Sequence, residues 1–375
     1  MNHSIIGKSF ITLAAVWSFA AICHGQNRYL VTDLGNLTAA STVAHKLNAS
    51  GHAAGTSGQR DGGGAHAAFW NDNAKTLQPV SVLDHADYSE AVSINNRNEM
   101  VGLSNTEKNM RAVLWTSEGA VRDLGTLPGD NSSRAFGIND HSRVVGMSSG
   151  AHGERAFVWS RQNGMEALAV PSNAKSSEAH GINNKDQIVG DFQAADETRA
   201  FLYTPNLGVE DLGVLPGFQN SKGTGINDWG EVVGSSSGPS GTRSFIWTKK
   251  EGMQAIDSIV PTEFSEALDI NNRGDVVGTY EGSLGNRAYR WNKEDGFVDL
   301  NRLLPAGSGA VLTLAVSIND QGQILAIGVS HGDISADRPV NQDEEDDLHS
   351  VDIHSFLLTP SSDVSHRRIE SRRIP

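Results

Sequence analysis

The chain has 375 residues and a formal charge of −14, because 30 Lys and Arg face 44 Asp and Glu. This charge argues against nucleic acid as a partner, since proteins bind the phosphate backbone through an excess of Lys and Arg. Cys23 is the only cysteine, which excludes a disulfide scaffold and a cysteine-based zinc site. With 38% hydrophobic residues, the chain can build a globular core.

The first 25 residues have the pattern of a secretory signal peptide. Lys8 precedes a mostly apolar run at residues 9–22, and the small residues Cys23 and Gly25 predict cleavage after Gly25. Lipidation of Cys23 is the alternative, but the bulky Ile22 disfavours it. The run of 14 residues is short for a membrane-spanning helix, so we expect export without membrane insertion. Loss of Lys8 makes the mature charge −14 − 1 = −15 and removes the only cysteine.

The rest of the chain repeats one unit seven times. An Ile-Asn or Leu-Asn pair marks each unit, and the intervals between successive asparagines are 47, 44, 44, 44, 44 and 48 residues. The marker asparagines are Asn48, Asn95, Asn139, Asn183, Asn227, Asn271 and Asn319. Because an active site needs only one copy of a residue, we expect these asparagines to bond backbone groups in turns.

Each unit carries four short strand signals and no helical periodicity. The third unit shows them at residues 133–139 (Ser-Arg-Ala-Phe-Gly-Ile-Asn), 144–146 (Val-Val-Gly) and 155–159 (Arg-Ala-Phe-Val-Trp), and the second unit adds 123–125 (Asp-Leu-Gly). The first two strands are joined by a tight turn that needs a left-handed residue. Four strands in about 44 residues is the size of one propeller blade.

The ends of the chain favour a closed ring. The last unit stops after its third strand at residues 355–358, and residues 29–35 match the missing fourth strand. Pairing these segments would leave no open sheet edge between the first and last blades. We therefore predict an all-β, seven-bladed β-propeller over residues 26–360, with an open or eight-strand-pair β-solenoid as the alternative, and a disordered tail at 361–375.

The recurring Ala-Phe strand, Ile-Asn turn, Val-Val-Gly strand and Asp-Leu-Gly-x-Leu-Pro-Gly linker resemble the bacterial extracellular family known as HAF repeats. The resemblance covers residues 29–360. It implies an exported, repetitive β protein, and it carries over no catalytic residue.

Two series of charged residues are expected near one end of the propeller. On the first strands, Glu90, Arg134, Glu178, Lys222 and Glu266 alternate in sign in five consecutive units, which predicts neighbour-to-neighbour ion pairs or a ligand site. A second ring stands at the start of the third strands: His66, Arg111, Arg155, Arg199, Arg243, Arg287 and His354. These cations suit an anionic saccharide, or each pairs with a carboxylate of its own or the next blade.

Departures from the repeat give the candidate chemistry. His85 and Tyr88 lie close in sequence and could act as base and acid of a lyase-type elimination, and His180 is a third candidate. Residues 330–354 form an acidic insertion in which His349, Asp352 and His354 have metal-ligand spacing, although acidic runs are commonly solvated. Nucleophile elbows and phosphate-binding loops are absent from the sequence, and we expect no cofactor.

These observations favour a secreted, non-enzymatic binding or scaffold module, with an anionic saccharide or another envelope component as partner. The alternative is an exported carbohydrate-active enzyme, a polysaccharide lyase or hydrolase, with its site at the propeller rim.

Overall fold

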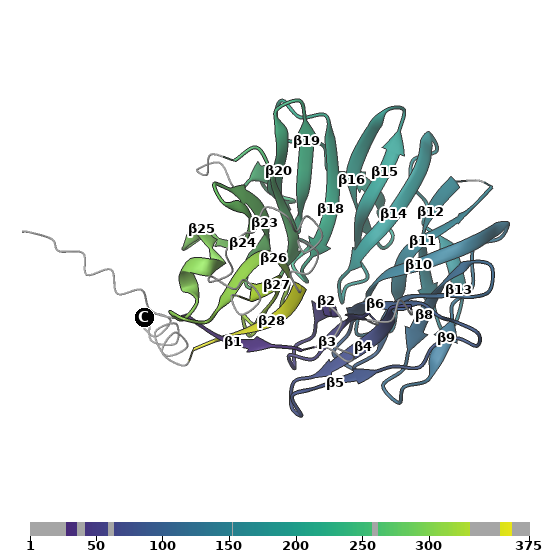
Figure 1. Ribbon diagram of the computed structural model, residues 1–375. Helices are drawn as coiled ribbons and strands as arrows, with labels where there is room; N and C mark the ends of the chain where they lie inside the picture. The colour runs from purple at the N-terminus through teal and green to yellow at the C-terminus, as the bar shows by residue number, and fades with distance from the viewer. Residues whose placement is uncertain are drawn as a thin grey trace, which may run out of the picture.

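The computed structural model describes residues 28–35, 42–58, 64–151, 153–256, 262–330 and 353–361. Within these residues the chain forms seven four-stranded antiparallel sheets and one short 3₁₀ helix. Figure 1 shows the sheets arranged around a common centre. The predicted seven-bladed β-propeller is confirmed. The predicted signal peptide at residues 1–25, His349, Asp352 and residues 362–375 lie outside the described part of the chain.

Six blades are simple meanders, in which each strand pairs with the next one in sequence. We number them in chain order. Blade 1 contains β2 (Thr42–Leu47), β3 (Ala53–Ser57), β4 (His66–Asn71) and β5 (Thr76–Pro79). Blade 2 contains β6 (Ser89–Ile94), β7 (Met100–Asn105), β8 (Met110–Trp115) and β9 (Val121–Asp123). Blade 3 contains β10 (Asp130–Ile138), β11 (Val144–Gly150), β12 (Gly153–Ser160) and β13 (Gly164–Ala167).

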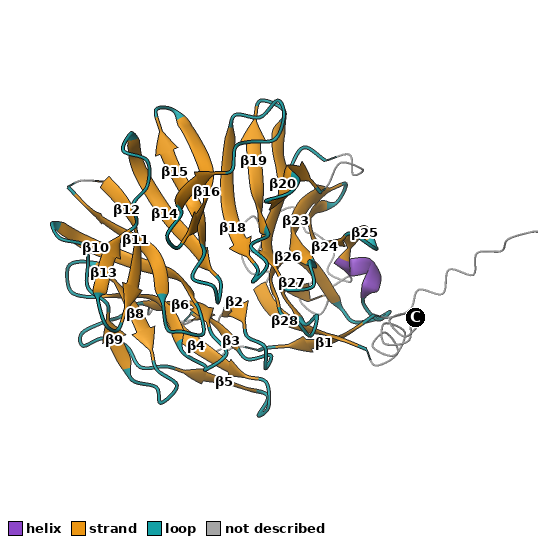
Figure 2. Cartoon of the chain, turned by 180° about the vertical axis from the view of Figure 1, so that it is seen from behind, coloured by secondary structure: helices purple, strands orange, loops and turns teal. Residues whose placement is uncertain are grey.

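The second half of the ring follows the same plan. Blade 4 contains β14 (Ala174–Ile182), β15 (Ile188–Ala194), β16 (Glu197–Thr204) and β17 (Gly208–Asp211). Blade 5 contains β18 (Asn220–Ile226), β19 (Val232–Gly238), β20 (Gly241–Thr248) and β21 (Gly252–Ala255). Blade 6 contains β22 (Ser265–Ile270), β23 (Val276–Gly282), β24 (Gly285–Asn292) and β25 (Gly296–Asp299), and the 3₁₀ helix η1 (Leu300–Leu303) follows β25 (Figure 2).

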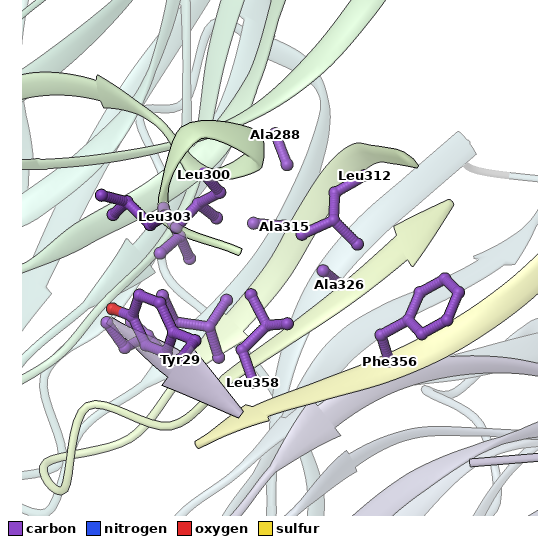
Figure 3. Close-up of a cluster of buried hydrophobic side chains, with 12 residues drawn as sticks. Tyr29, Ala288, Leu300, Leu303, Leu312, Ala315, Ala326, Phe356 and Leu358 are labelled. Carbon is purple, nitrogen blue, oxygen red and sulfur yellow. The ribbon is translucent and has the colours of Figure 1, made fainter. Parts of the chain in front are cut away.

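Blade 7 is built from both ends of the chain. It contains β26 (Ala310–Ile318), β27 (Ile324–Ser330), β28 (Ile353–Pro360) and the N-terminal strand β1 (Tyr29–Asp33). Strand β1 pairs antiparallel with β28, from Tyr29 opposite Pro360 to Asp33 opposite Phe356. Figure 3 shows Tyr29 beside Leu358, in a buried cluster that also contains Leu300 and Leu303 of η1. The predicted closure by the N-terminal strand is confirmed.

The turn between the first and second strands of each blade has the expected backbone. Its third residue after the marker asparagine has a positive φ in every blade, including the non-glycine residues Asn98, Ser142 and Asp186 at φ 57–60°. Each first strand also carries a β-bulge, as at His180 in blade 4, where the register shifts between Ala179 and Gly181. In blade 4 glycine is required opposite the bulge, because a Cβ at Gly190 would collide with the carbonyl oxygen of Glu178.

The marker asparagines form a closed hydrogen-bonded ring at one end of the propeller, which we call the asparagine face. Each side-chain Nδ2 donates to the backbone carbonyl of the next blade's asparagine at 2.9–3.1 Å, and Asn319 closes the ring onto Asn48. Each Oδ1 accepts backbone N–H groups of its own turn, as with Arg97 and Glu99 on Asn95. The asparagines therefore shape their turns, as predicted, and also join neighbouring blades.

Serine side chains join the blades at mid-height. Ser89, Ser133, Ser177, Ser221 and Ser265 are buried on first strands, and each Oγ accepts the backbone N–H of a third-strand residue in the preceding blade at 2.9–3.0 Å. The hydrophobic clusters likewise span neighbouring blades, as where Val101 and Leu114 of blade 2 join Phe157 and Trp159 of blade 3. The core is therefore divided among the interfaces between blades.

The described part of the chain contains no helix of the length and apolarity that crossing a bilayer requires.

Candidate functional site

The alternating charged residues of the first strands lie around the propeller axis. First strands of successive blades contact one another around the ring, as β10 contacts β6 and β14, which places these strands innermost. We call Glu90, Arg134, Glu178, Lys222 and Glu266 the axial series. Arg134 and Lys222 are exposed, whereas the three glutamates are half-buried. The first and third strands begin at the end of the propeller opposite the asparagine face, and we call this end the arginine face. The axial series lies toward the arginine face.

The expected ion pairs between neighbouring members of the axial series are not present. In the described structure no two of its side chains come within 4.0 Å of each other, and Arg134 and Lys222 make no ion pair at all. Burial raises the pKa of both Glu178 and Glu266, and the charge of nearby Lys222 offsets part of this rise. Two cations thus remain available to a ligand, with carboxylates on the blades between and beside them.

Blade 4 contributes an acid–base group to this region. His180 Nε2 lies 2.8 Å from Asp191 Oδ1 and 3.9 Å from Glu178 Oε2. The Asp191 side chain is 12% exposed and Glu178 is 32% exposed. Burial raises the pKa of the Glu178 carboxyl, and the neighbouring Asp191 and Glu154 carboxylates raise it further, against the opposing charge of His180 and Lys222. Phe136 of blade 3 packs against the His180 ring with centroids 5.7 Å apart.

Blade 2 holds a second polar group around Glu90. The Tyr88 hydroxyl donates to Glu90 Oε2 at 3.0 Å, and His45 Nε2 of blade 1 lies 3.2 Å from Glu90 Oε1. Burial raises the pKa of Tyr88, and the adjacent Glu90 carboxylate adds to the effect. Burial lowers the pKa of His45, against the opposing charge of Glu90. The Glu90 carboxylate is therefore in contact with both Tyr88 and His45.

The structure does not bring His85 to Tyr88 or His180. His85 is exposed, has a φ of 64° and makes no hydrogen bond with the described residues. Its candidate partner Tyr88 is engaged by Glu90. Among the three catalytic candidates, His180 is the one with a carboxylate held against its ring.

Several cations at the start of the third strands pair within their own blades. Arg155 Nη2 lies 2.9 Å from Asp130, Arg199 2.6 Å from Glu197, Arg111 Nε 3.8 Å from Asp123, and His354 Nδ1 2.7 Å from Asp33. Arg287 makes no ion pair with the described residues. The Nδ1 of His66 is buried without a hydrogen-bond partner among them. Arg243 lies beside a groove lined by Leu215, Phe218 and Met253.

The metal-binding candidates are only partly described. His349 and Asp352 lie outside the described residues, and His354 lies against Asp33 with its ring stacked on Phe356. No group of three or more His, Cys, Asp or Glu in the described ranges is arranged to hold a metal ion.

A polar pocket of about 170 Å³ opens on the axis at the asparagine face. The ends of all seven first strands line it, and an outer belt of Asn and Asp surrounds it: Asn96, Asp140, Asn184, Asp228, Asn272 and Asp320. Their Oδ1 atoms accept backbone N–H groups of the preceding blades at 2.8–2.9 Å. The belt therefore acts as a second tie between blades.

Two features of the site were missed by sequence reasoning. Asp191 partners His180 across the blade, and the position it occupies holds Leu103, Met147 or Ser235 in other blades. This departure from the repeat was a usable signal. The β-bulge at His180 gave none, because it depends on the pairing of two strands rather than on one residue type.

No family model matches this chain, and no curated protein does. Solved structures share its architecture at low identity. Virginiamycin B lyase from Staphylococcus aureus gives a TM-score of 0.54 at 12% identity, covering 89% of this chain and 100% of that one. YCF48 bound to D1 peptide gives 0.52 at 13% identity, covering 90% and 97%.

The β-propeller domain of the Trilobed protease from Pyrococcus furiosus, described as having an open velcro topology, gives a TM-score of 0.51 at 11% identity and covers 78% of this chain and 91% of its own. These similarities place the chain in the β-propeller class by fold alone. Within that class, the pairing of β1 with β28 makes this ring a closed one.

Proposed function

We propose that this protein is a secreted binding module that takes an acidic saccharide, such as one of the cell envelope, on the arginine face of its axis. Export rests on the signal-peptide pattern of residues 1–25. The HAF-repeat resemblance agrees with a place outside the cytoplasm. The ligand class rests on the axial series.

The observation that carries the proposal is that Arg134 and Lys222 are exposed and unpaired within the described structure, although three carboxylates lie on the blades around them. Arg is suited to hold a ligand carboxylate through two parallel hydrogen bonds, and Lys adds a second point of positive charge. A protein of net negative charge that keeps two cations free here has a site for anionic groups.

The carboxylates of the axial series suit the remaining groups of a sugar. Glu178 and Glu266 are half-buried, and their carboxyl oxygens can accept hydrogen bonds from ligand hydroxyls. Arg287 provides a further cation without an ion pair among the described residues, on the same face. The paired cations Arg111, Arg155 and Arg199 are less available, because a ligand would have to displace their carboxylate partners.

The test is a glycan array probed with the mature chain from residue 26, comparing acidic and neutral saccharides. We expect binding to acidic saccharides, and for a hit we expect R134A/K222A to weaken binding at least about tenfold, as loss of two charge-assisted contacts requires. Lys250→Ala is the matched control, since Lys250 is an exposed cation at the asparagine face.

Two results would contradict the proposal. One is selective binding of neutral saccharides, and the other is unchanged affinity of the double variant for an acidic one. Removal of residues 1–25 during export from a bacterial host, read from the N-terminal sequence of the released protein, tests the secretion half separately.

A further inference from the structure

His180, Asp191 and Glu178 lie in blade 4, between the two unpaired cations of the axial series. Arg134 is on β10 and Lys222 on β18, and both strands contact β14, which carries Glu178 and His180. None of the equivalent positions in the other blades combines these three side chains. The fold therefore does not require these three side chains to occur together.

The contact with Asp191 sets which ring nitrogen of neutral His180 carries the proton. An ionised carboxylate only accepts hydrogen bonds, so the proton of neutral His180 sits on Nε2, 2.8 Å from Asp191 Oδ1. The lone pair is then on Nδ1, where it can accept a proton from a substrate. Asp191 in turn stabilises the imidazolium that forms, as a buried carboxylate does for a catalytic histidine.

Glu178 has the complementary property. Its carboxyl is partly exposed and accepts no hydrogen bond in the described structure, and burial beside other carboxylates raises its pKa toward the protonated form. A carboxyl group whose pKa is raised in this way is suited to donate a proton to a leaving oxygen. His180 and Glu178 thus provide a proton acceptor and a proton donor next to each other.

On the basis of the proposed saccharide site, we propose that His180 and Glu178 are the base and acid of a β-elimination that cleaves a bound acidic saccharide at a uronate residue. His180 Nδ1 takes the C5 proton, which is acidic because it lies next to the carboxylate. The C5–H electron pair forms the C4=C5 double bond as the C4–O bond breaks. The leaving oxygen takes the proton of Glu178.

The remaining charges suit this step. Electron density moves onto the uronate carboxylate when C5 loses its proton, and the Lys222 ammonium, close enough to act on the Glu178 pKa, can stabilise it. After product release His180 loses its proton to solvent and Glu178 regains one, so protons balance. No metal, oxidant or added water is consumed.

The second polar group of the region is less suited to this chemistry. The Tyr88 hydroxyl donates a hydrogen bond to Glu90, and His45 has its Nε2 against the same carboxylate. A substrate would have to separate these partners before either could act. The His180 group presents its base and its acid without such a rearrangement.

The experiment incubates the mature protein with a panel of polyuronates and follows the ultraviolet absorbance of the conjugated C4=C5 bond, with product masses measured in parallel. We expect unsaturated products whose combined mass equals that of the substrate. We expect His180→Gln, which keeps an amide near Asp191 but removes the base, to lower kcat about 100-fold or more while binding is retained. Glu178→Gln should lower kcat similarly.

Asp191 is a positioning residue, and Asp191→Asn should lower kcat while leaving KM unchanged, because Asp191 acts through His180 only. His141→Gln is the control, since His141 lies in a turn of the asparagine face, and it should retain full activity. Thermal unfolding of each variant shows whether the fold is kept.

The possible outcomes distinguish the elimination proposal from the binding proposal. If the wild type binds an acidic saccharide but releases no unsaturated product, or releases products that have gained water, the elimination is overturned while the binding proposal stands. Full activity of His180→Gln overturns the assignment of the base. If the wild type binds no acidic saccharide, both proposals fall.

Discussion

Glu99 shows how much one side chain can contribute between two blades. Its carboxylate is 8% exposed and accepts hydrogen bonds from Asn95, Ser142, Arg97 and Arg161 at 2.7–2.9 Å. Burial alone would raise the pKa of Glu99, but these four donors outweigh it and lower the pKa to about 2. Since Ser142 and Arg161 belong to blade 3, the contacts link blades 2 and 3.

We expect Glu99→Gln to lower the free energy of unfolding at pH 7 by about 2 kcal/mol, because a neutral amide loses the charge-assisted bonds. A carboxyl whose pKa is lower in the folded state stabilises the fold above its unfolded pKa, near 4.5, and loses this contribution as the pH falls toward 2. The difference between wild type and variant should therefore shrink over that range.

Urea unfolding followed at several pH values measures this difference. Glu107→Gln, at an exposed loop position, is the control and should leave stability within about 0.5 kcal/mol of wild type. A Glu99→Gln variant as stable as wild type at pH 7 would show that the four hydrogen bonds contribute nothing net.

At the scale of the strand, the sequence predicted some roles well and missed others for a clear reason. The positive φ of Asn98, Ser142 and Asp186 was predictable, because turn geometry depends on neighbouring residues. The role of Ser133 was not, because its partner Ala112 lies 21 residues earlier, in the preceding blade.

Ser133→Ala is expected to destabilise the propeller by about 1–3 kcal/mol. Ser133 Oγ accepts the Ala112 N–H at 2.9 Å and donates to the Gly125 carbonyl at 2.6 Å, so its loss removes a partner from the buried Ala112 N–H and from the half-buried Gly125 carbonyl. Denaturant midpoints measure the effect, and Ser117→Ala, in an exposed loop, is the control. Equal midpoints for both variants would mean that the blade interface absorbs the loss.

The candidate site was only partly predictable for the same reason. The alternating signs of Glu90, Arg134 and Glu178 could be taken from strand periodicity, and they do lie together around the axis. The absence of ion pairs between them could not, because a side chain's partner depends on three-dimensional distance. Asp191 contacts His180, and the Tyr88 hydroxyl donates to Glu90. Neither contact could be inferred from the first strands alone.

At the scale of the whole molecule, closure of the ring depends on the pairing of the two ends of the chain (Figure 1). Tyr29 is 3% exposed and Leu34 is also 3% exposed, so β1 is fixed by packing as well as by its hydrogen bonds. The total blade number was predictable from the repeat, and so was the closure, because the missing strand of the last unit had a match at residues 29–35.

A disulfide across this seam tests the closure in solution. Leu30 lies directly opposite Thr359, and a chain that starts at residue 26 has no native cysteine. We expect L30C/T359C to oxidise readily and to gain about 3 kcal/mol of stability, because the bond closes a loop of nearly the whole chain. A reductant should reverse the gain.

The single variant Leu30→Cys, measured with and without reductant, is the control and should show no such change. Mass spectrometry of the oxidised double variant detects the bond. Free thiols at both positions after oxidation would show that the terminal strands are not paired.

The number seven has a consequence for the polar belt around the asparagine face. Six of its positions alternate strictly between Asn and Asp, and the seventh, Ala49, has no acceptor for the neighbouring Asp320 turn. Because the ring has an odd number of positions, two residue types cannot alternate all the way around it, and the alternation must break at one place. On the opposite face the positions of the axial series are likewise apolar in blades 1 and 7, at Val43 and Leu314. Both breaks in the alternation therefore lie where the first and last blades meet. Adding or removing one blade elsewhere would set two like side chains next to each other, whereas a change by two would keep the order, so blade pairs are the natural units for shortening or lengthening this protein.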